Sequence, residues 1–201
     1  MSRHSEAESA SRLLAYGADV TAAADSSRGL AWDLPTLASA HQITLLSPDF
    51  DDGGPLGVIH AASRAGGQNV SPALTWTSTA GAAQLLLIVE DPDAPTRIPY
   101  LHCIALLDPS MAGLDRGALS DPVAPGVRFA RSAVGPGYFG PAPPKSHGPH
   151  RYVFQLFALE AATDDAVGLD TLPAAALRTL LTQSVRVLAR GRIDGRYQRT
   201  S

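Results

Sequence analysis

Short apolar runs separated by turn residues dominate the chain from residue 43 onward, a pattern typical of strands in a mainly β domain. In the run QLLLIV at 84–89 every residue after the glutamine is apolar, which predicts a central strand buried on both faces. Residues 100–107 and 152–159 predict two more central strands. Outer strands are expected at 42–46, 56–59, 73–76 and 192–197. Many strands with few helices indicate two packed sheets.

One helix is predicted late in the chain, over 172–191. Apolar residues recur there at helical spacing, from Leu177 to Leu188. Pro173 suits a first helical turn and Gly191 suits the position after the last turn. We therefore expect this helix to lie beside the sheets.

Residues 1–40 have a different pattern from the rest. Residues 5–16 have helical composition with a short apolar face, and small and polar residues follow up to a turn at 33–35. We interpret 1–40 as an N-terminal extension, helical or partly disordered, and 41–201 as the folded domain.

Composition narrows the class of protein. The 201 residues are 45% hydrophobic and 17% charged, with a net charge of −3, which argues against a general nucleic-acid binder. The single cysteine, Cys103, excludes an intramolecular disulfide. No apolar run approaches the roughly 20 residues of a membrane span, and the first residues lack the apolar core of a secretory signal. The sequence predicts a cytoplasmic protein.

Carboxylates follow the most apolar strand directly. In EDPDAP, at 90–95, two prolines stiffen the backbone that carries Asp91 and Asp93. Carboxylates at the end of a buried strand are partly desolvated and need partners. Two interpretations stay open here: a polar turn capped by its own aspartates, or part of a binding site.

A lone histidine, His102, interrupts the next apolar strand. Alternation along a strand predicts that it shares a face with Tyr100 and Ile104. It is either a core residue with a satisfied hydrogen bond or part of a ligand site.

A loop rich in glycine and proline precedes the strand at 152–159. Nine of the seventeen residues from 134 to 150 are glycine or proline, and the loop ends in KSHGPHRY. A period of two places His150 and Tyr152 on one face of the sheet and Arg151 on the other, where a carboxylate can pair with it. Glycine amides can approach a bound anion closely. The arginines after residue 185 indicate a solvated edge or, alternatively, a site for phosphate or an acidic partner.

These motifs in this order resemble the phosphatidylethanolamine-binding protein family, in particular its bacterial Raf-kinase-inhibitor-like branch. DPDAP at 91–95, the strand histidine and GPHRY at 148–152 carry the likeness, with SPALTW at 71–76 and DGRYQR at 194–199. The resemblance covers about residues 43–197. It implies a large antiparallel sheet packed on a smaller one, a C-terminal helix, and a small pocket that accepts anions such as phosphate or a phospholipid head group.

The resemblance also implies which residues form that pocket. The expected ligand-binding residues are Asp91, His102, Pro143, Pro144, His150 and Tyr152, with Asp93 and Arg151 as structural support. One departure concerns the strand histidine, which the family usually flanks with aromatic residues. Leu101 and Cys103 flank it in this chain, which implies a wider pocket or weaker stacking on a head group.

The function expected from this resemblance is that of a non-enzymatic binding protein for phosphate-bearing ligands or head groups, without cofactor or metal, which regulates a kinase or protease. The alternative is a scaffold or inhibitor whose partner surface carries the function; a homodimer is compatible with either. Both pocket histidines are expected to gain charge near their ordinary pKa of about 6.5, so phosphate should bind more tightly at pH 6 than at pH 8.

Two enzyme alternatives stay open. Asp91, His102, His147 and His150 could hold a metal, although no strong zinc pattern is present. Ser146 or Cys103 could serve a hydrolase as nucleophile, although neither lies in a recognisable nucleophile motif.

Overall fold

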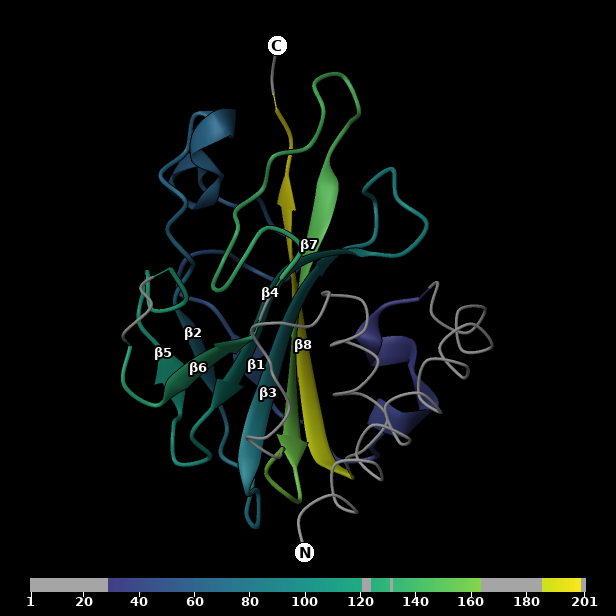
Figure 1. Ribbon diagram of the computed structural model, residues 1–201, viewed down its shortest axis with the longest axis vertical. Coiled ribbons are helices and arrows are strands. Elements are labelled where there is room, and N and C mark those ends of the chain that lie inside the picture. Colours follow the sequence, from purple (N-terminus) through teal and green to yellow (C-terminus); the bar gives the residue numbers. More distant parts are fainter. Residues whose placement is uncertain (1–28, 121–123, 131, 164–185, 200–201) are drawn as a thin grey trace, which may run out of the picture.

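Two antiparallel sheets form the protein, as the sequence predicted. The computed structural model describes residues 29–120, 124–130, 132–163 and 186–199, and Figure 1 shows the arrangement. The large sheet has the strand order β6-β4-β3-β7-β8 and the small sheet β1-β2-β5. The strands are β1 (Leu45–Leu46), β2 (Leu74–Trp76), β3 (Gln84–Asp91), β4 (Tyr100–Leu107), β5 (Gly113–Leu114), β6 (Val127–Ala130), β7 (His150–Leu159) and β8 (Val187–Tyr197).

The three central strands of the large sheet are those predicted from apolar runs. β3 pairs with β4 on one side and with β7 on the other, and nearly every residue of these strands is buried. A strand that neighbours cover on both faces gains from apolar side chains at every position, which explains the unbroken run in QLLLIV.

Each face of the large sheet has its own apolar core. The inner face packs against the small sheet, where Trp76 and Leu74 meet Leu87 and Phe154. The outer face, on the other side, buries a second cluster that includes Leu86 and Phe157. Residues at alternate positions of one strand therefore serve two separate cores.

The outer core is closed by a short segment near the N-terminus, residues 30–38, which we term the N-terminal strap. It contains two 3-10 helices, η1 (Ala31–Asp33) and η2 (Pro35–Leu37), seen in purple beside the sheet in Figure 1. The backbone N–H of Ala31 donates to Glu90 Oε2 at 2.7 Å, and that of Trp32 donates to Gln155 Oε1 at 2.6 Å. Two fully buried polar side chains of the sheet thus find their partners in the strap.

The prediction that the late helix continues through residues 187–191 is wrong. Residues 187–191 lie in β8, which runs antiparallel to β7, so Leu188 and Gly191 are strand residues. The greater part of the predicted helix, 172–185, and residues 1–28 of the predicted extension lie outside the described residues.

The other departures are local. The strand expected at 56–59 is absent; Pro55 forms an isolated bridge to Arg196, and the chain then turns into η3 (Val58–His60), followed by η4 (Ser63–Ala65). The short strands β5 and β6 were not predicted. Among the described residues, no helix has the length and apolar character needed to cross a bilayer.

Candidate functional site

One cavity gathers all the pocket residues that the sequence predicted. It has a volume of about 210 Å³ and lies where β3 ends and where β4 and β7 begin. Its lining comprises Asp91, His102, Pro143, Pro144, His150 and Tyr152, together with Arg64, Ala94, Pro95, Thr96, Tyr100 and Ala142. The structure thus brings the predicted residues together, whereas their role in ligand binding stays a prediction.

The Gly/Pro loop that forms one wall is tied down by Asn69. This residue adopts a left-handed backbone (φ 57°), and its side-chain amide donates to Tyr138 O at 3.0 Å and accepts from Gly140 N at 2.8 Å. A Cβ at residue 140 would lie 2.2 Å from the carbonyl oxygen of His60. Glycine at 140 therefore lets the loop pack directly against a neighbouring backbone.

A β-bulge directs His102 toward the cavity. Val89 pairs with Cys103 and Glu90 pairs with Leu101, so His102 is the extra residue of β4. A bulge re-aims a side chain relative to simple alternation. The expectation that Ile104 shares the face of His102 is wrong, because Ile104 belongs to the outer core.

Three aromatic rings from other positions surround His102. The rings of Tyr100 and Tyr152 meet it edge-on, with centroids at 5.1 and 5.0 Å, and Phe139 stacks on it at 5.9 Å. The absence of aromatic neighbours at 101 and 103 therefore does not leave the imidazole without rings. Its aromatic contacts come from Tyr100 earlier in β4, from Phe139 in the loop and from Tyr152 in β7.

His102 is neutral at physiological pH, contrary to the expectation that it gains charge there. Burial lowers its pKa from 6.5 to about 4, and the hydrogen bond with Phe139 opposes this only in part. Its Nδ1 lies 2.5 Å from the carbonyl oxygen of Phe139, so Nδ1 carries the proton and donates. The other nitrogen, Nε2, is then an acceptor.

The hydroxyl of Tyr152 is the unsatisfied polar group of the cavity. The residue is 1% exposed, and among the described residues its hydroxyl has no hydrogen-bond partner at normal geometry. Burial raises the pKa of Tyr152, and the nearby backbone N–H of Ala142 opposes this only in part, so the hydroxyl keeps its proton and still needs an acceptor. A buried donor without a partner is costly, which makes this group a natural contact for a ligand.

His150 links the cavity floor to the surface. Its Nδ1 lies 2.8 Å from Asp91 Oδ2, and its Nε2 lies 2.8 Å from Nδ1 of His147, which is exposed. Asp91 also accepts from Asp93 N at 2.8 Å. Both nitrogens of His150 are thus occupied within the protein, so its direct contact with a ligand would require His147 to move.

Asp93 and Arg151 form the pair that was expected to support the site. The guanidinium of Arg151 donates to both oxygens of Asp93, at 2.9 and 2.7 Å, and its backbone N–H donates at 2.8 Å. The hydrogen bond from Arg151 holds the pKa of Asp93 below its ordinary value. This clamp joins the DPDAP turn to the first residues of β7.

Arg64 is the charged residue among the cavity-lining residues that the sequence did not predict. It is exposed, lines the cavity, and places its guanidinium 5.0 Å from the ring centroid of Phe139. It follows η3 in a polar segment without strand or helix periodicity, so no local pattern indicated it. Arg64 supplies a cation at the cavity rim.

The enzyme alternatives gain no support from this geometry. In the described part of the chain no group of three His, Cys, Asp or Glu side chains is arranged so that it could hold one metal ion. Burial raises the pKa of the Cys103 thiol to about 12, which leaves almost no thiolate to act as nucleophile. Ser146, on the exposed turn, has no hydrogen bond to either histidine among the described residues.

Comparison with known proteins gives a consistent result. The sequence model of the phosphatidylethanolamine-binding proteins matches residues 46–198. A UPF0098 protein of Mycobacterium bovis is 32% identical over 185 residues, which are 88% of this chain and 86% of that protein. A Mycobacterium tuberculosis protein named as a lipoprotein, LppC, is 40% identical over 128 residues, 62% of this chain and 59% of its own length.

Solved structures agree with the sequence matches. E. coli YbcL, described as a member of the mammalian PEBP family, superposes with a TM-score of 0.68 at 26% identity and covers 78% of this chain and 98% of its own. Chlamydia trachomatis CT736, described as a homolog of the phosphatidylethanolamine-binding proteins, superposes with a TM-score of 0.65 at 25% identity and covers 79% of this chain and 99% of its own.

Proposed function

Because this chain belongs to the phosphatidylethanolamine-binding protein family, we propose that it is a non-enzymatic binding protein whose cavity takes a phosphate-bearing ligand. The ligand is a phosphorylated small molecule or the head group of a phospholipid, which share a phosphate ester. The fold and the family membership support a binding role, and the chemistry of the cavity supports this class of ligand.

The observation that carries the proposal is the buried hydroxyl of Tyr152, a donor without a partner in a cavity of about 210 Å³. A phosphate oxygen would accept from it. Arg64 at the rim adds the positive charge that attracts an anion. Together they make a small polar site with few, well-placed donors.

For a phosphomonoester ligand, His102 determines which protonation state binds, whereas the phosphodiester of a phospholipid head group has no P–OH to donate. The Nε2 of His102 is an acceptor at neutral pH, because its pKa is about 4 and Nδ1 holds the proton. A phosphate monoanion carries a P–OH that can donate to Nε2, whereas a dianion must first protonate His102. A phosphomonoester loses that second proton with a pKa of about 6. Affinity should therefore fall as the pH rises.

Calorimetric titration with phosphoethanolamine tests this proposal. We expect weak, saturable binding that is roughly fiftyfold tighter at pH 6 than at pH 8, because with a pKa of about 6 the monoanion falls from about half of the ligand to about one hundredth. Arg64→Gln should weaken binding at both values. Absence of binding at both values, at millimolar ligand, would contradict the proposal; equal affinity at both would contradict the role given to His102.

The regulation of a kinase or protease and a homodimer stay predictions that rest on the resemblance. So does the cytoplasmic location, and one relative is named as a lipoprotein. A pull-down can separate a role for the cavity from a role for another surface, by comparing the intact chain with His150→Ala and with a truncated chain. The truncation should end at residue 28, because the strap at 30–38 holds the buried side chains of Glu90 and Gln155.

A further inference from the structure

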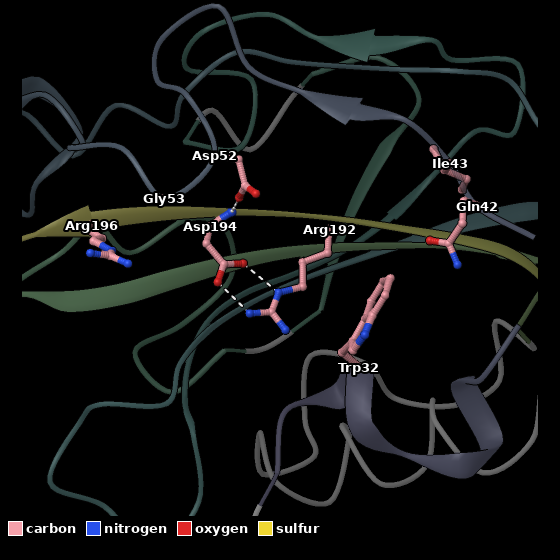
Figure 2. Close-up of a pocket in the computed structure, with 8 residues that line it drawn as sticks. All are labelled: Trp32, Gln42, Ile43, Asp52, Gly53, Arg192, Asp194 and Arg196. Carbon is pink, nitrogen blue, oxygen red and sulfur yellow. Dashed lines mark hydrogen bonds and ion pairs between the residues drawn. The ribbon is translucent and has the colours of Figure 1, made fainter. Parts of the chain in front are cut away.

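A second cavity, separate from the first, lies at the free edge of the large sheet. It has a volume of about 450 Å³ and shares no lining residue with the cavity around His102. Figure 2 shows its lining residues, which are Trp32, Gln42, Ile43, Asp52, Gly53, Arg192, Asp194 and Arg196. A cavity of this size can accept a small organic molecule or a short piece of peptide.

The edge strand β8 is paired on its outer side at two places. Before the cavity, Ile43 N donates to Arg190 O at 2.8 Å and Arg190 N donates to His41 O at 3.1 Å. After the cavity, Gly53 N donates to Asp194 O at 2.7 Å and Arg196 N donates to Gly54 O at 2.8 Å. Both flanking segments run parallel to β8.

Between these segments the edge is open at Arg192. Arg190, Asp194 and Arg196 all turn their backbone N–H and C=O groups away from β7. Because these groups alternate along a strand, those of Arg192, which is two positions from Arg190 and from Asp194, also point away from β7. Because these two groups point away from β7, they need partners on the outer side, and among the described residues neither the N–H nor the C=O of Arg192 has one. One donor and one acceptor therefore face the cavity.

The gap arises because the chain leaves the edge to build the small sheet. The carbonyl oxygen of Ile43 would lie 2.5 Å from a Cβ at residue 191, so glycine there lets the chain cross β8 toward β1. When the chain returns, the carboxylate of Asp52 accepts from Asp194 N at 2.9 Å. The side chain of Asp52 thus satisfies the backbone N–H of Asp194, whereas the backbone groups of Arg192 have no such partner among the described residues.

Side-chain contacts hold two walls of the cavity in place, and one lining arginine has no carboxylate partner among the described residues. Arg192 makes a two-pronged ion pair with Asp194, at 2.7 and 2.6 Å. Trp32 is held by the guanidinium of Arg190, 4.0 Å from the ring centroid. Arg196 is exposed and has no carboxylate partner among the described residues; it lies across from Arg151, whose charge Asp93 already matches.

We propose that this second cavity binds one residue of an extended peptide segment that runs antiparallel to β8, with an acidic side chain directed to Arg196. In an antiparallel hydrogen-bonded pair two residues exchange both backbone bonds, which is what the open N–H and C=O of Arg192 require. Flanking segments 41–43 and 53–56 limit the added strand to a single paired residue. Addition of peptide to a sheet edge is a recurrent mode of recognition.

The full-length protein and a synthetic tripeptide, acetyl-Ala-Glu-Ala-amide, test this proposal. Trp32 is the tryptophan beside the cavity, whereas Trp76 is buried in the inner core, so a change in tryptophan fluorescence reports on the cavity. We expect saturable binding with a Kd on the order of 1 mM. An ester analogue that lacks the glutamate N–H should bind about fivefold to tenfold more weakly, since it loses one hydrogen bond.

Matched variants separate this cavity from the first. Arg196→Gln should abolish the preference for the Glu peptide over acetyl-Ala-Lys-Ala-amide while keeping the weaker binding of the ester. Trp32→Phe should remove the fluorescence change but keep the heat of binding. Tyr152→Phe should change nothing. Equal binding of ester and amide, loss of binding in Tyr152→Phe, or no saturation up to about 10 mM would each overturn the proposal.

Discussion

Two buried tyrosines allow a controlled test of the cavity around His102. The hydroxyl of Tyr152 has no hydrogen-bond partner among the described residues, whereas that of Tyr138 donates to the carbonyl oxygen of His60 at 3.2 Å. Both residues are at most 5% exposed, so their replacement by phenylalanine changes one buried oxygen in each case. The two substitutions should have opposite effects on stability and on binding.

The magnitudes follow from the hydrogen bonds. Tyr138→Phe leaves a buried carbonyl without its donor and should lower the free energy of unfolding by about 1–2 kcal/mol. Tyr152→Phe removes a group that is already unsatisfied, so stability should stay the same or rise by up to about 1 kcal/mol. A hydrogen bond to a charged ligand is worth roughly 1.5–3 kcal/mol, so Tyr152→Phe should weaken phosphoethanolamine binding roughly tenfold to a hundredfold.

Urea denaturation gives the stabilities, and calorimetry at pH 6 gives the affinities. The reasoning is supported if one variant loses binding without losing stability and the other does the reverse. It is refuted if Tyr152→Phe loses more than about 1 kcal/mol of stability, because the hydroxyl would then have a structural partner. Unchanged affinity in Tyr152→Phe would equally remove the basis for the proposed function.

Further predictions concern His102, the N-terminal strap and the Asp93 clamp. Because the pKa of His102 falls from 6.5 to about 4 on folding, the unfolded chain binds the extra proton first; stability should drop by roughly 3 kcal/mol as the pH falls from 6.5 to 4, and NMR titration should find the imidazole neutral above pH 5. Removal of residues 1–40 should lower the urea midpoint strongly, because Glu90 and Gln155 lose the backbone donors of Ala31 and Trp32. Asp93→Asn should lower the free energy of unfolding by less than about 1 kcal/mol at pH 7, because its ion pair with Arg151 is solvent-accessible; urea denaturation measures this. That contribution should also begin to decline in the wild type as the pH falls below about 4, and it should be lost only below the lowered pKa of Asp93 in the folded protein.

The sequence predicted the sheets well because their signals are local. The run at 85–89 is apolar at every position, as expected for a strand covered on both faces. The late helix shows the limit of such patterns. Residues 187–193 carry small or apolar side chains at alternate positions, and this period of two places them in β8 although Leu188 also fits a helical face.

The candidate site was predicted from motifs, and its details were not. The bulge at His102 depends on the pairing of two strands, and its neighbours are apolar under either register, so no local pattern marks it. Phe139 and Arg64 reach the histidine from segments far along the chain. The low pKa of His102 follows from burial by these neighbours, which composition and spacing do not encode.

Two consecutive acids at the end of β3 serve opposite sides of the protein: Glu90 anchors the strap on the outer face, and Asp91 holds His150 in the cavity. A shift of β3 by one position would exchange them between the faces. The shorter carboxylate would then have to span the distance to Ala31, and the longer one would crowd the imidazole. Insertion or deletion of a single codon within 84–91 should therefore damage the anchoring of the N-terminal segment and the ligand site in the same event, although the two share no atom.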